Sequence, residues 1–502
     1  MLGRKSFLLF LSRILVALLS YVGLLFMLRT YGDSGYGTLS YAMAFVSTFN
    51  AFSDMGFSSA HVKRISEGKD LNDCVCTYAV IKASLTLLMV VITLVSTYLW
   101  TVLLGHGLDD ITTEMILIIV LYYVLIDLSS IATNTFTAKM EMVKLPIATL
   151  ADPLIRVPLV ILSCFLGLSL IGLFWMYVIS AVGVVLVATY LLLRGPIMWR
   201  HPTLFRSYYK FALPLMLISI ISVLGSTMDR LILGFYYTPD EVAFYYAPQA
   251  MLTSFAVIGT AVATLTFPSF SKLHSEGNIA MIRKVTQEAE RYILMLSLPI
   301  SILLLTFPYE MSSILLNEMV EAADIIGIMT ITYLLLMINS VDSTQITAVD
   351  RPDVTARISL VSFFVTLISL FILIPTSDQS FLGIGLGLSY VGAALALLIG
   401  RIVTFIITRY VVWKLTGTIP DKRLAFQLLA ALAVFLVIYP MSFVLPITRI
   451  YIILLYGLVS VSVFIGVLYL MKEFTRKDLD YFLQLMDIKE MWAYIKTELR
   501  SK

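Results

Sequence analysis

The chain has 502 residues, of which 59% are hydrophobic and 13% are charged, and its formal net charge is +3. Soluble globular domains carry about 25% charged residues, so this composition excludes a soluble protein and indicates a polytopic membrane protein. Nothing in it points to nucleic acid. The three cysteines, Cys74, Cys76 and Cys164, are too few and too scattered for a disulfide framework, and we interpret them as ordinary thiols.

Apolar runs of about 20 residues, the length that crosses a bilayer core as a helix, recur along the whole chain. In order they cover residues 7–28, 36–60, 78–104, 111–136, 145–166, 171–193, 211–236, 242–267, 292–307, 322–349, 358–374, 382–411, 424–445 and 450–471. The first run is too long for a signal sequence and has no cleavage site after it, so we expect it to be retained. The sequence thus predicts an all-α membrane protein with about fourteen transmembrane helices.

Basic residues alternate between the loops. The N-terminus and every second loop contain Lys or Arg, whereas the loops between them are nearly free of both, with only Arg29 and Arg449 as exceptions. Several of these loops are acidic, such as GHGLDDITTE after the third run and TPDE after the seventh. Loops rich in Lys and Arg stay in the cytoplasm. The pattern therefore predicts a multi-pass protein of the cytoplasmic (cell) membrane with both termini in the cytoplasm.

Two stretches of the sequence resemble each other. The second run and the eighth begin alike, and both lead to Ser-Glu-Gly, at residues 66–68 and 275–277. Parallel repeats of this kind are common in transporters, although two amphipathic segments could also converge. We predict two six-helix lobes around a central cavity. The predicted parts are an N-terminal lobe at 1–193, a basic cytoplasmic linker at 194–210, a C-terminal lobe at 211–414, a further two-helix segment at 415–471 and an amphipathic cytoplasmic tail at 472–502.

Several apolar runs contain charged residues, which are costly against lipid and usually face a bundle interior or a wet cavity. Residues 211–236 carry Asp229 and Arg230 near their far end, and Ser219, Ser222 and Ser226 precede this pair at helical spacing. Other polar faces are built around Asp54, Asp127, Asp152 with Arg156, Asp342 and Arg401. The alternative is that such charges only pair and stabilise the bundle, which is strongest for Asp152 and Arg156 at i, i+4. Arg13, Lys82 and Arg409 lie close enough to cytoplasmic ends to snorkel there.

Two sequence blocks carry a family resemblance. MDRLILGFYYTPDEVAFYYAPQ at 228–249 resembles a segment common to Wzx-type polysaccharide transporters, and YGDSGYGTLSYA at 31–42 is similar to the corresponding first-half segment. These proteins belong to the superfamily of multidrug, oligosaccharidyl-lipid and polysaccharide exporters. The resemblance implies a flippase, not an enzyme, that moves a polyprenyl- or dolichyl-linked oligosaccharide to the outer leaflet for polysaccharide or glycan biosynthesis.

An anionic lipid (di)phosphate requires cations, and the planar guanidinium of Arg suits phosphate. The candidates for substrate binding are Arg13, Lys82, Arg156, Arg230 and Arg401, and those for counter-ions or cation coupling are Asp54, Asp127, Asp152, Asp229 and Asp342. We expect alternating access driven by a sodium or proton gradient. The chain has no GxxxxGK[ST] motif for ATP, and we expect no cofactor, metal site or catalytic residue. The expected partners are the lipid-linked oligosaccharide, membrane lipids and glycan-assembly enzymes.

Two other functions remain open at this point. A cation-coupled multidrug antiporter of the same superfamily would share the two lobes but typically has twelve helices. A membrane glycosyltransferase or polysaccharide polymerase would handle similar lipids, and Asp109, Asp110 and Glu114 form an acidic external group. Their loop is too short for an active-site domain, so we interpret them as solvated loop residues.

Overall fold

The computed structural model describes residues 2–103, 110–141, 143–194, 198, 200–317, 319–380, 383–475 and 478. Helices dominate this part of the chain, because a segment inside lipid must satisfy its backbone N–H and C=O groups within itself. The elements are α1 (Leu2–Asn50), η1 (Ala51–Ser53), α2 (Phe57–Ser66), α3 (Leu71–Leu103), α4 (Asp110–Ala138), α5 (Lys144–Phe165), α6 (Leu170–Leu193), α7 (Phe205–Leu224), α8 (Met228–Tyr236), α9 (Pro239–Phe255), α10 (Val257–Ser275), α11 (Ile279–Thr306), α12 (Pro308–Leu315), η2 (Val320–Ala322), α13 (Ala323–Ala348), α14 (Pro352–Leu373), α15 (Ser389–Thr416), α16 (Leu424–Val444) and α17 (Ile450–Leu470).

The chain folds into two compact units. The N-terminal unit comprises Leu11–Tyr246, and the C-terminal unit comprises Met1–Phe10 together with Ala247–Lys502. The boundaries between the units therefore fall inside helices, one near the start of α1 and one in the middle of α9.

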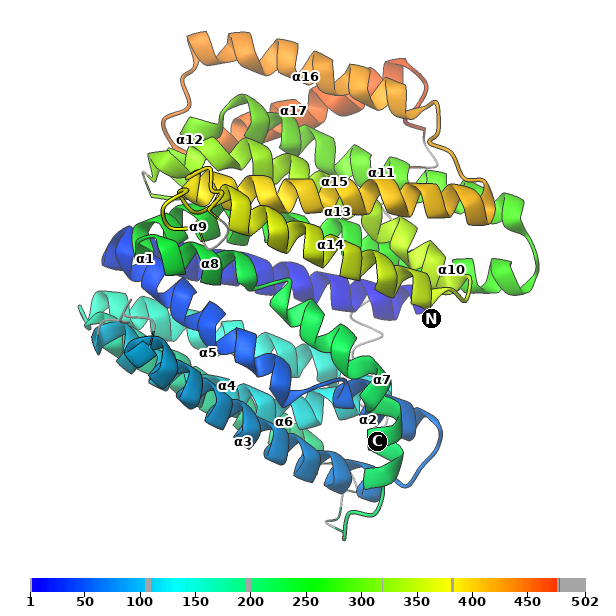
Figure 1. Cartoon of the computed structure of the whole chain (residues 1–502). Coiled ribbons are helices and arrows are strands. Elements are labelled where there is room, and N and C mark those ends of the chain that lie inside the picture. The colour runs from blue at the N-terminus through cyan, green and yellow to red at the C-terminus, as the bar shows by residue number, and fades with distance from the viewer. Residues whose placement is uncertain are drawn as a thin grey trace. The chain divides into compact units, whose positions relative to one another are not determined.

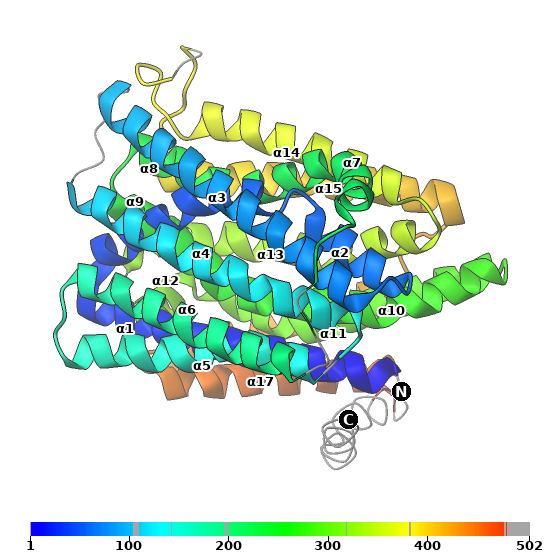
Figure 2. The same cartoon turned by 90° about the horizontal axis from the view of Figure 1, so that it is seen from below.

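The N-terminal unit is a bundle around α4 and α6. Helix α6 packs along both α4 and α5, and α3 packs along α4, as both views show (Figures 1 and 2). The short α2 contacts α3, α4 and α7 and closes one end of this bundle. These contacts bring the polar residues of α3, α4 and α5 into one unit.

The C-terminal unit is organised by α11, α13 and α15. Helix α13 packs against α10, α11 and α15, and α14 lies along α15 (Figure 1). Helices α16 and α17 form a pair, and both contact α11. Helix α11 therefore stands between the helices of the predicted second lobe and the additional C-terminal pair.

The number of apolar helices agrees with the sequence prediction. Thirteen helical segments of the described chain are long and apolar enough to cross a membrane. The first, Ile14–Ser53, contains Gly32, whose φ of 69° and ψ of −173° break α1 into two arms. Counting these arms separately gives the predicted fourteen, and the all-helical membrane fold is confirmed. Most of the predicted tail at 472–502 lies outside the described residues.

The backbone is less continuous than the apolar runs suggested. The predicted helix at 36–60 breaks at Met55 and Gly56, whose φ angles of 43° and 81° are left-handed. The predicted helix at 211–236 divides into α7 and α8, so the expected stripe from Ser219 to Asp229 does not lie on one helix. The predicted helix at 242–267 divides at Ala256 into α9 and α10. Hydropathy reports the apolar environment of a segment and is insensitive to such breaks.

Candidate functional site

A buried ion pair joins α3 and α4 of the N-terminal unit. Lys82 Nζ lies 2.7 Å from Asp127 Oδ1, and the two side chains are only 4% and 7% exposed. Lys82 also donates to the backbone oxygen and Oγ of Ser53, at 3.0 and 3.1 Å, and Thr86 donates to the other Asp127 oxygen. The ammonium is therefore held deep inside the unit and does not snorkel. The predicted binding residue Lys82 and the predicted counter-ion Asp127 neutralise each other.

A second pair lies within α5. Arg156 Nη2 is 3.0 Å from Asp152 Oδ2, as the i, i+4 spacing predicted, and it also donates to Ser20 Oγ at 3.4 Å. The guanidinium stands over the ring of Tyr177, 5.3 Å from its centroid. Asp152 is one quarter exposed, so this pair is more accessible than Lys82–Asp127.

The third pair lies at the start of α8. Asp229 is buried and accepts a hydrogen bond from the Tyr245 hydroxyl at 2.6 Å. Arg230 Nη2 donates to the Ser226 carbonyl at 2.9 Å, and its guanidinium lies 4.4 Å from the centroid of Tyr246. Arg230 Nε is 3.9 Å from Asp229 Oδ1 and has no hydrogen-bond partner among the described residues. The local contacts thus leave part of this buried guanidinium unused.

A series of tyrosine contacts starts at Arg156, and another tyrosine lies against Arg230. Tyr177, under Arg156, makes an edge contact with Tyr122 at 5.9 Å, and Tyr122 makes another with Tyr123 at 5.5 Å. Tyr123 lies within electrostatic range of Tyr246 and Arg230, and Tyr246 stacks on Tyr36 at 5.9 Å. We call these five residues, Tyr36, Tyr122, Tyr123, Tyr177 and Tyr246, the tyrosine array. The sequence analysis named no tyrosine as a candidate site residue and so missed the array.

A cluster of unequal charge lies in the C-terminal unit. Arg409 of α15 contacts Glu290 of α11 at 2.7 Å and Asp342 of α13 at 3.4 Å. The carboxylate side chains are 1% and 0% exposed, and their oxygens have no hydrogen-bond partner with good geometry in the described chain. One turn along α13, Gln345 accepts from Thr286 at 2.8 Å and donates to Thr416 at 2.7 Å. Two buried carboxylates therefore share one guanidinium.

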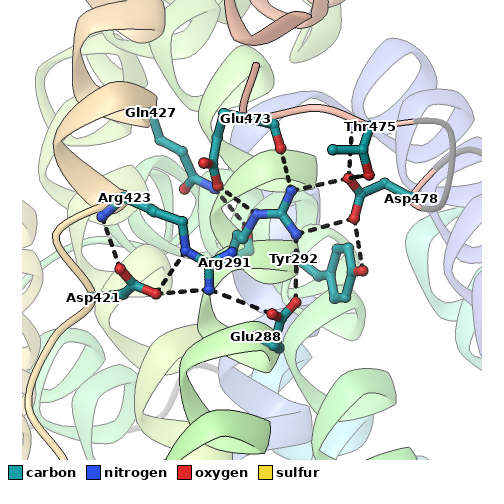
Figure 3. A network of polar contacts seen from close by, with 9 residues as sticks. All are labelled: Glu288, Arg291, Tyr292, Asp421, Arg423, Gln427, Glu473, Thr475 and Asp478. Carbon is teal, nitrogen blue, oxygen red and sulfur yellow. Dashed lines mark hydrogen bonds and ion pairs between the residues drawn. The ribbon is translucent and has the colours of Figure 1, made fainter. Parts of the chain in front are cut away.

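The next residue of α11, Arg291, is the centre of a second network in this unit (Figure 3). It contacts Glu473 at 2.6 Å and Asp478 at 3.0 Å, both after α17, and Gln427 of α16 donates to its backbone oxygen at 3.0 Å. Burial alone would raise the pKa of Asp478, but hydrogen bonds from Arg291 and Thr475 hold it well below its ordinary value. Arg291 thus fastens the segment after α17 to α11.

The same network reaches the segment before α16. Glu288 lies 3.4 Å from Arg291 and 3.3 Å from Arg423, which also contacts Asp421 at 2.7 Å (Figure 3). Burial opposes ionisation of Asp421, but hydrogen bonds from Arg423 keep its pKa below the ordinary value. The start of α16 and the end of α17 are therefore tied to one turn of α11. The basic loops predict that these two ends lie on the cytoplasmic side.

Three further site residues were predicted from the sequence. Asp54 lies in the break before α2, where it accepts hydrogen bonds from the backbone of Gly56 and Ser58 at 3.1 and 3.2 Å. Arg401 lies in α15 and is half-buried. The side chain of Arg13 lies outside the described residues. The roles of these residues in binding or coupling stay predictions.

Glu290 and Arg291 are two charged residues of α11 that sequence reasoning missed. The predicted membrane run began at residue 292, because the preceding charges lowered its hydropathy, whereas α11 begins at Ile279. Asn278 caps this helix by accepting from the backbone of Met281 at 3.1 Å. The spacing of Ile282, Thr286 and Ala289, all buried, is the signal that could have extended the helix.

Comparisons with known proteins agree with this architecture. A family model described as "Polysaccharide biosynthesis protein" matches residues 2–274. None of the curated proteins compared with the chain matches it.

Several solved membrane proteins share the fold. The lipid II flippase MurJ in an inward closed conformation has a TM-score of 0.74 at 16% identity, and the match covers 92% of this chain and 98% of that one. An inward-facing multidrug resistance MATE transporter has a TM-score of 0.61 at 15% identity, with 81% and 96% covered. A transporter of the MOP superfamily from Pyrococcus furiosus has a TM-score of 0.57 at 14% identity, and the match covers 82% of this chain and 96% of that one.

Proposed function

Because the chain belongs to the family of polysaccharide biosynthesis proteins, we propose that it is a flippase for a lipid-linked oligosaccharide. The lipid carrier is a polyprenyl or dolichyl (di)phosphate, and the glycan moves from the cytoplasmic to the outer leaflet of the cell membrane. In this proposal the protein is a transporter without a catalytic step. Both termini lie in the cytoplasm, where glycan-assembly enzymes supply the substrate.

The observation that carries the proposal is the pairing of Arg156 and Arg230 with the tyrosine array. Both guanidinium groups are largely buried, and Arg230 Nε has no hydrogen-bond partner in the described chain. A phosphate oxygen is a strong acceptor for such a group. Tyrosine hydroxyls between the two arginines add donors and acceptors for sugar hydroxyls, while the rings pack against apolar sugar faces. This chemistry suits the junction of a diphosphate and its first sugars.

We propose further that a sodium ion or a proton couples at the cluster of Glu290, Asp342 and Arg409. One guanidinium cannot neutralise two carboxylates, and an uncompensated buried charge is unfavourable. A cation that enters with the gradient removes this excess. Each elementary charge that moves through the membrane potential supplies about 2.3 kcal/mol per 100 mV, which can drive alternating access.

Transport of a fluorescent polyprenyl-diphosphate oligosaccharide in proteoliposomes tests the proposal. We expect the parent to flip this lipid and Arg156→Ala and Arg230→Ala to lose most of the activity. Arg357→Ala is the matched control, because the Arg357 side chain is 76% exposed at the start of α14. All four proteins are compared at equal insertion and with equal elution profiles.

The outcomes separate the two transporter functions. Loss of flipping in the two arginine variants, with the control active, supports a cationic phosphate site. A parent that moves no lipid-linked sugar but exports cationic dyes down a sodium or proton gradient is a multidrug antiporter, and the flippase proposal fails. In that case Arg156 and Arg230 act only as structural ion pairs.

A further inference from the structure

Two buried carboxyl groups of the C-terminal unit lie next to each other, one on α11 and one on α13. The side chains of Glu290 and Asp342 are 1% and 0% exposed, and they are within hydrogen-bonding reach of each other. An ionised carboxylate only accepts hydrogen bonds, so two of them cannot bond to each other, and their like charges repel. Their contact is favourable when one of the two carries a proton.

The oxygens of this pair lack a hydrogen-bond donor. All four are shielded from solvent, and within the described chain none has a hydrogen-bond partner. Arg409 lies 2.7 Å from Glu290 and 3.4 Å from Asp342, which gives two ion pairs but only one positive charge. Buried acceptors without a donor cost free energy. A proton on one carboxyl group supplies a donor that is directed at the other.

The other half of the chain provides a balanced counterpart. The predicted repeats place α3 and α4 where α11 and α13 stand in the second half. Lys82 of α3 pairs with Asp127 of α4 at 2.7 Å, and Thr86 donates to the second Asp127 oxygen. One cation there faces one carboxylate. The C-terminal cluster has one carboxyl group more, and a single bound proton restores the same balance.

Among the described residues, the charged groups around the pair supply no second cation. The charged neighbours of Asp342 are Arg409 and Glu290. Glu290 faces the same arginine and also Asp421, before α16, which adds negative charge. Arg291, the next residue of α11, is bound to the acidic side chains of its own network (Figure 3). The excess of negative charge at the pair is therefore not compensated from its surroundings.

Arg409 also distinguishes between the two candidate coupling ions. A proton bonds covalently to a carboxyl oxygen and needs no shell of further ligands. A sodium ion would bind as a separate positive charge beside the guanidinium, which is 2.7 Å from Glu290. Two cations that close repel strongly in a site shielded from water. The cluster therefore suits a proton better than sodium.

We propose that Glu290 and Asp342 share one proton, as a carboxylic acid hydrogen-bonded to a carboxylate whose charge is balanced by Arg409. The shared proton follows from the cluster alone, whereas its use as the coupling ion in place of sodium rests on the proposed flippase function. Release of this proton to water leaves two carboxylates against one guanidinium. Binding and release therefore switch the cluster between a neutral state and a state with one negative charge.

Infrared difference spectroscopy of the full-length protein tests for the shared proton. The signal is the C=O band of a carboxylic acid, which ionised carboxylates lack and which shifts in heavy water. Spectra are recorded in a detergent without carbonyl groups, from neutral to alkaline pH, first without sodium and then with saturating sodium at constant ionic strength. The variants are Glu290→Gln, Asp342→Asn and the control Glu321→Gln, which removes an exposed acid of η2. Binding of radioactive sodium is measured on the same proteins, and elution profiles confirm that they are folded.

We expect the parent and Glu321→Gln to show the acid band at neutral pH and to lose it as the pH rises. The band should be absent from both Glu290→Gln and Asp342→Asn, because each leaves one carboxylate for Arg409. Sodium should leave the band of the parent unchanged. A parent without the band, a band retained in both variants, or sodium binding that removes the band or is lost in Asp342→Asn would overturn the proposal. Because this assay uses no lipid-linked substrate, its failure beside normal flipping leaves the flippase proposal intact.

Discussion

Two buried charge clusters differ in their charge balance, so we expect an Asp→Asn substitution to affect the free energy of unfolding differently in each. In the N-terminal unit, Lys82 faces one carboxylate, Asp127, at 2.7 Å. In the C-terminal unit, Arg409 faces two, Glu290 at 2.7 Å and Asp342 at 3.4 Å. Asp127→Asn therefore leaves a buried ammonium without its counter-ion. Asp342→Asn leaves the shorter Arg409–Glu290 pair in place and removes the excess charge.

The magnitudes follow from the cost of a broken buried pair, which is about 3–5 kcal/mol. We expect Asp127→Asn to lower the free energy of unfolding by an amount near that range, since Lys82 is 3% exposed. Asp342→Asn should change the free energy of unfolding by less than about 1 kcal/mol or raise it. Arg409→Leu, which leaves two carboxylates without a cation, should be as destabilising as Asp127→Asn.

Denaturant unfolding in one neutral detergent at neutral pH measures these free energies, with elution profiles as a control for aggregation. Liposome flipping with imposed sodium and proton gradients follows for the variants that fold. Asp342→Asn should flip lipid without responding to the coupling gradient. A loss of stability in Asp342→Asn as large as that in Asp127→Asn would refute the charge count. An intact gradient response in a stable Asp342→Asn protein would refute only the coupling site.

Three further predictions rest on local contacts. Gly37→Ala should lower the yield of folded protein, because the added Cβ meets the Pro239 carbonyl. Gly466→Ala should be tolerated, because a Cβ there has no neighbour within 4 Å. The thermal midpoints of the two variants are compared with that of the parent. Arg291→Met should raise deuterium uptake at 473–475, because Glu473 and Asp478 lose their main cation. Burial lowers the pKa of His61 to about 3, so protonation favours unfolding. The stability advantage of the parent over His61→Gln should therefore shrink as the pH falls from about 6.5 towards 3, by about 1.4 kcal/mol per unit; an advantage independent of pH would contradict this.

The membrane-crossing pattern was predictable because it depends on local composition. Long apolar runs must be helical in lipid, and the alternation of basic loops checks their number. The breaks were not predictable from this signal, since both positions are apolar: Met55, where φ is 43°, and Ala256, which separates α9 from α10. Charges that lower hydropathy also hid residues 279–291 of α11, and with them Glu290 and Arg291.

The candidate site was predictable in its residues but not in its pairings. The pair of Asp152 and Arg156 follows from i, i+4 spacing on one helix. The partners Lys82 and Asp127 are 45 residues apart, and only the packing of α3 on α4 brings them together. The tyrosine array depends on four helices in one unit, so no spacing in the sequence could have revealed it.

The two consecutive charges of α11 connect the proposed coupling site to the additional helix pair. Glu290 faces α13 and α15, while Arg291 faces the segments that flank α16 and α17. Successive residues of an α-helix point in different directions, so one turn serves both contacts. If a cation at Glu290 and Asp342 shifts α11, the displacement must also strain the Arg291 network, because that network has little freedom when its guanidinium is 4% exposed. We therefore expect Arg291→Met to change the gradient dependence of flipping as well as the anchoring of the C-terminal segment, whereas a coupling response identical to the parent's would show that the helix pair is independent of the transport cycle.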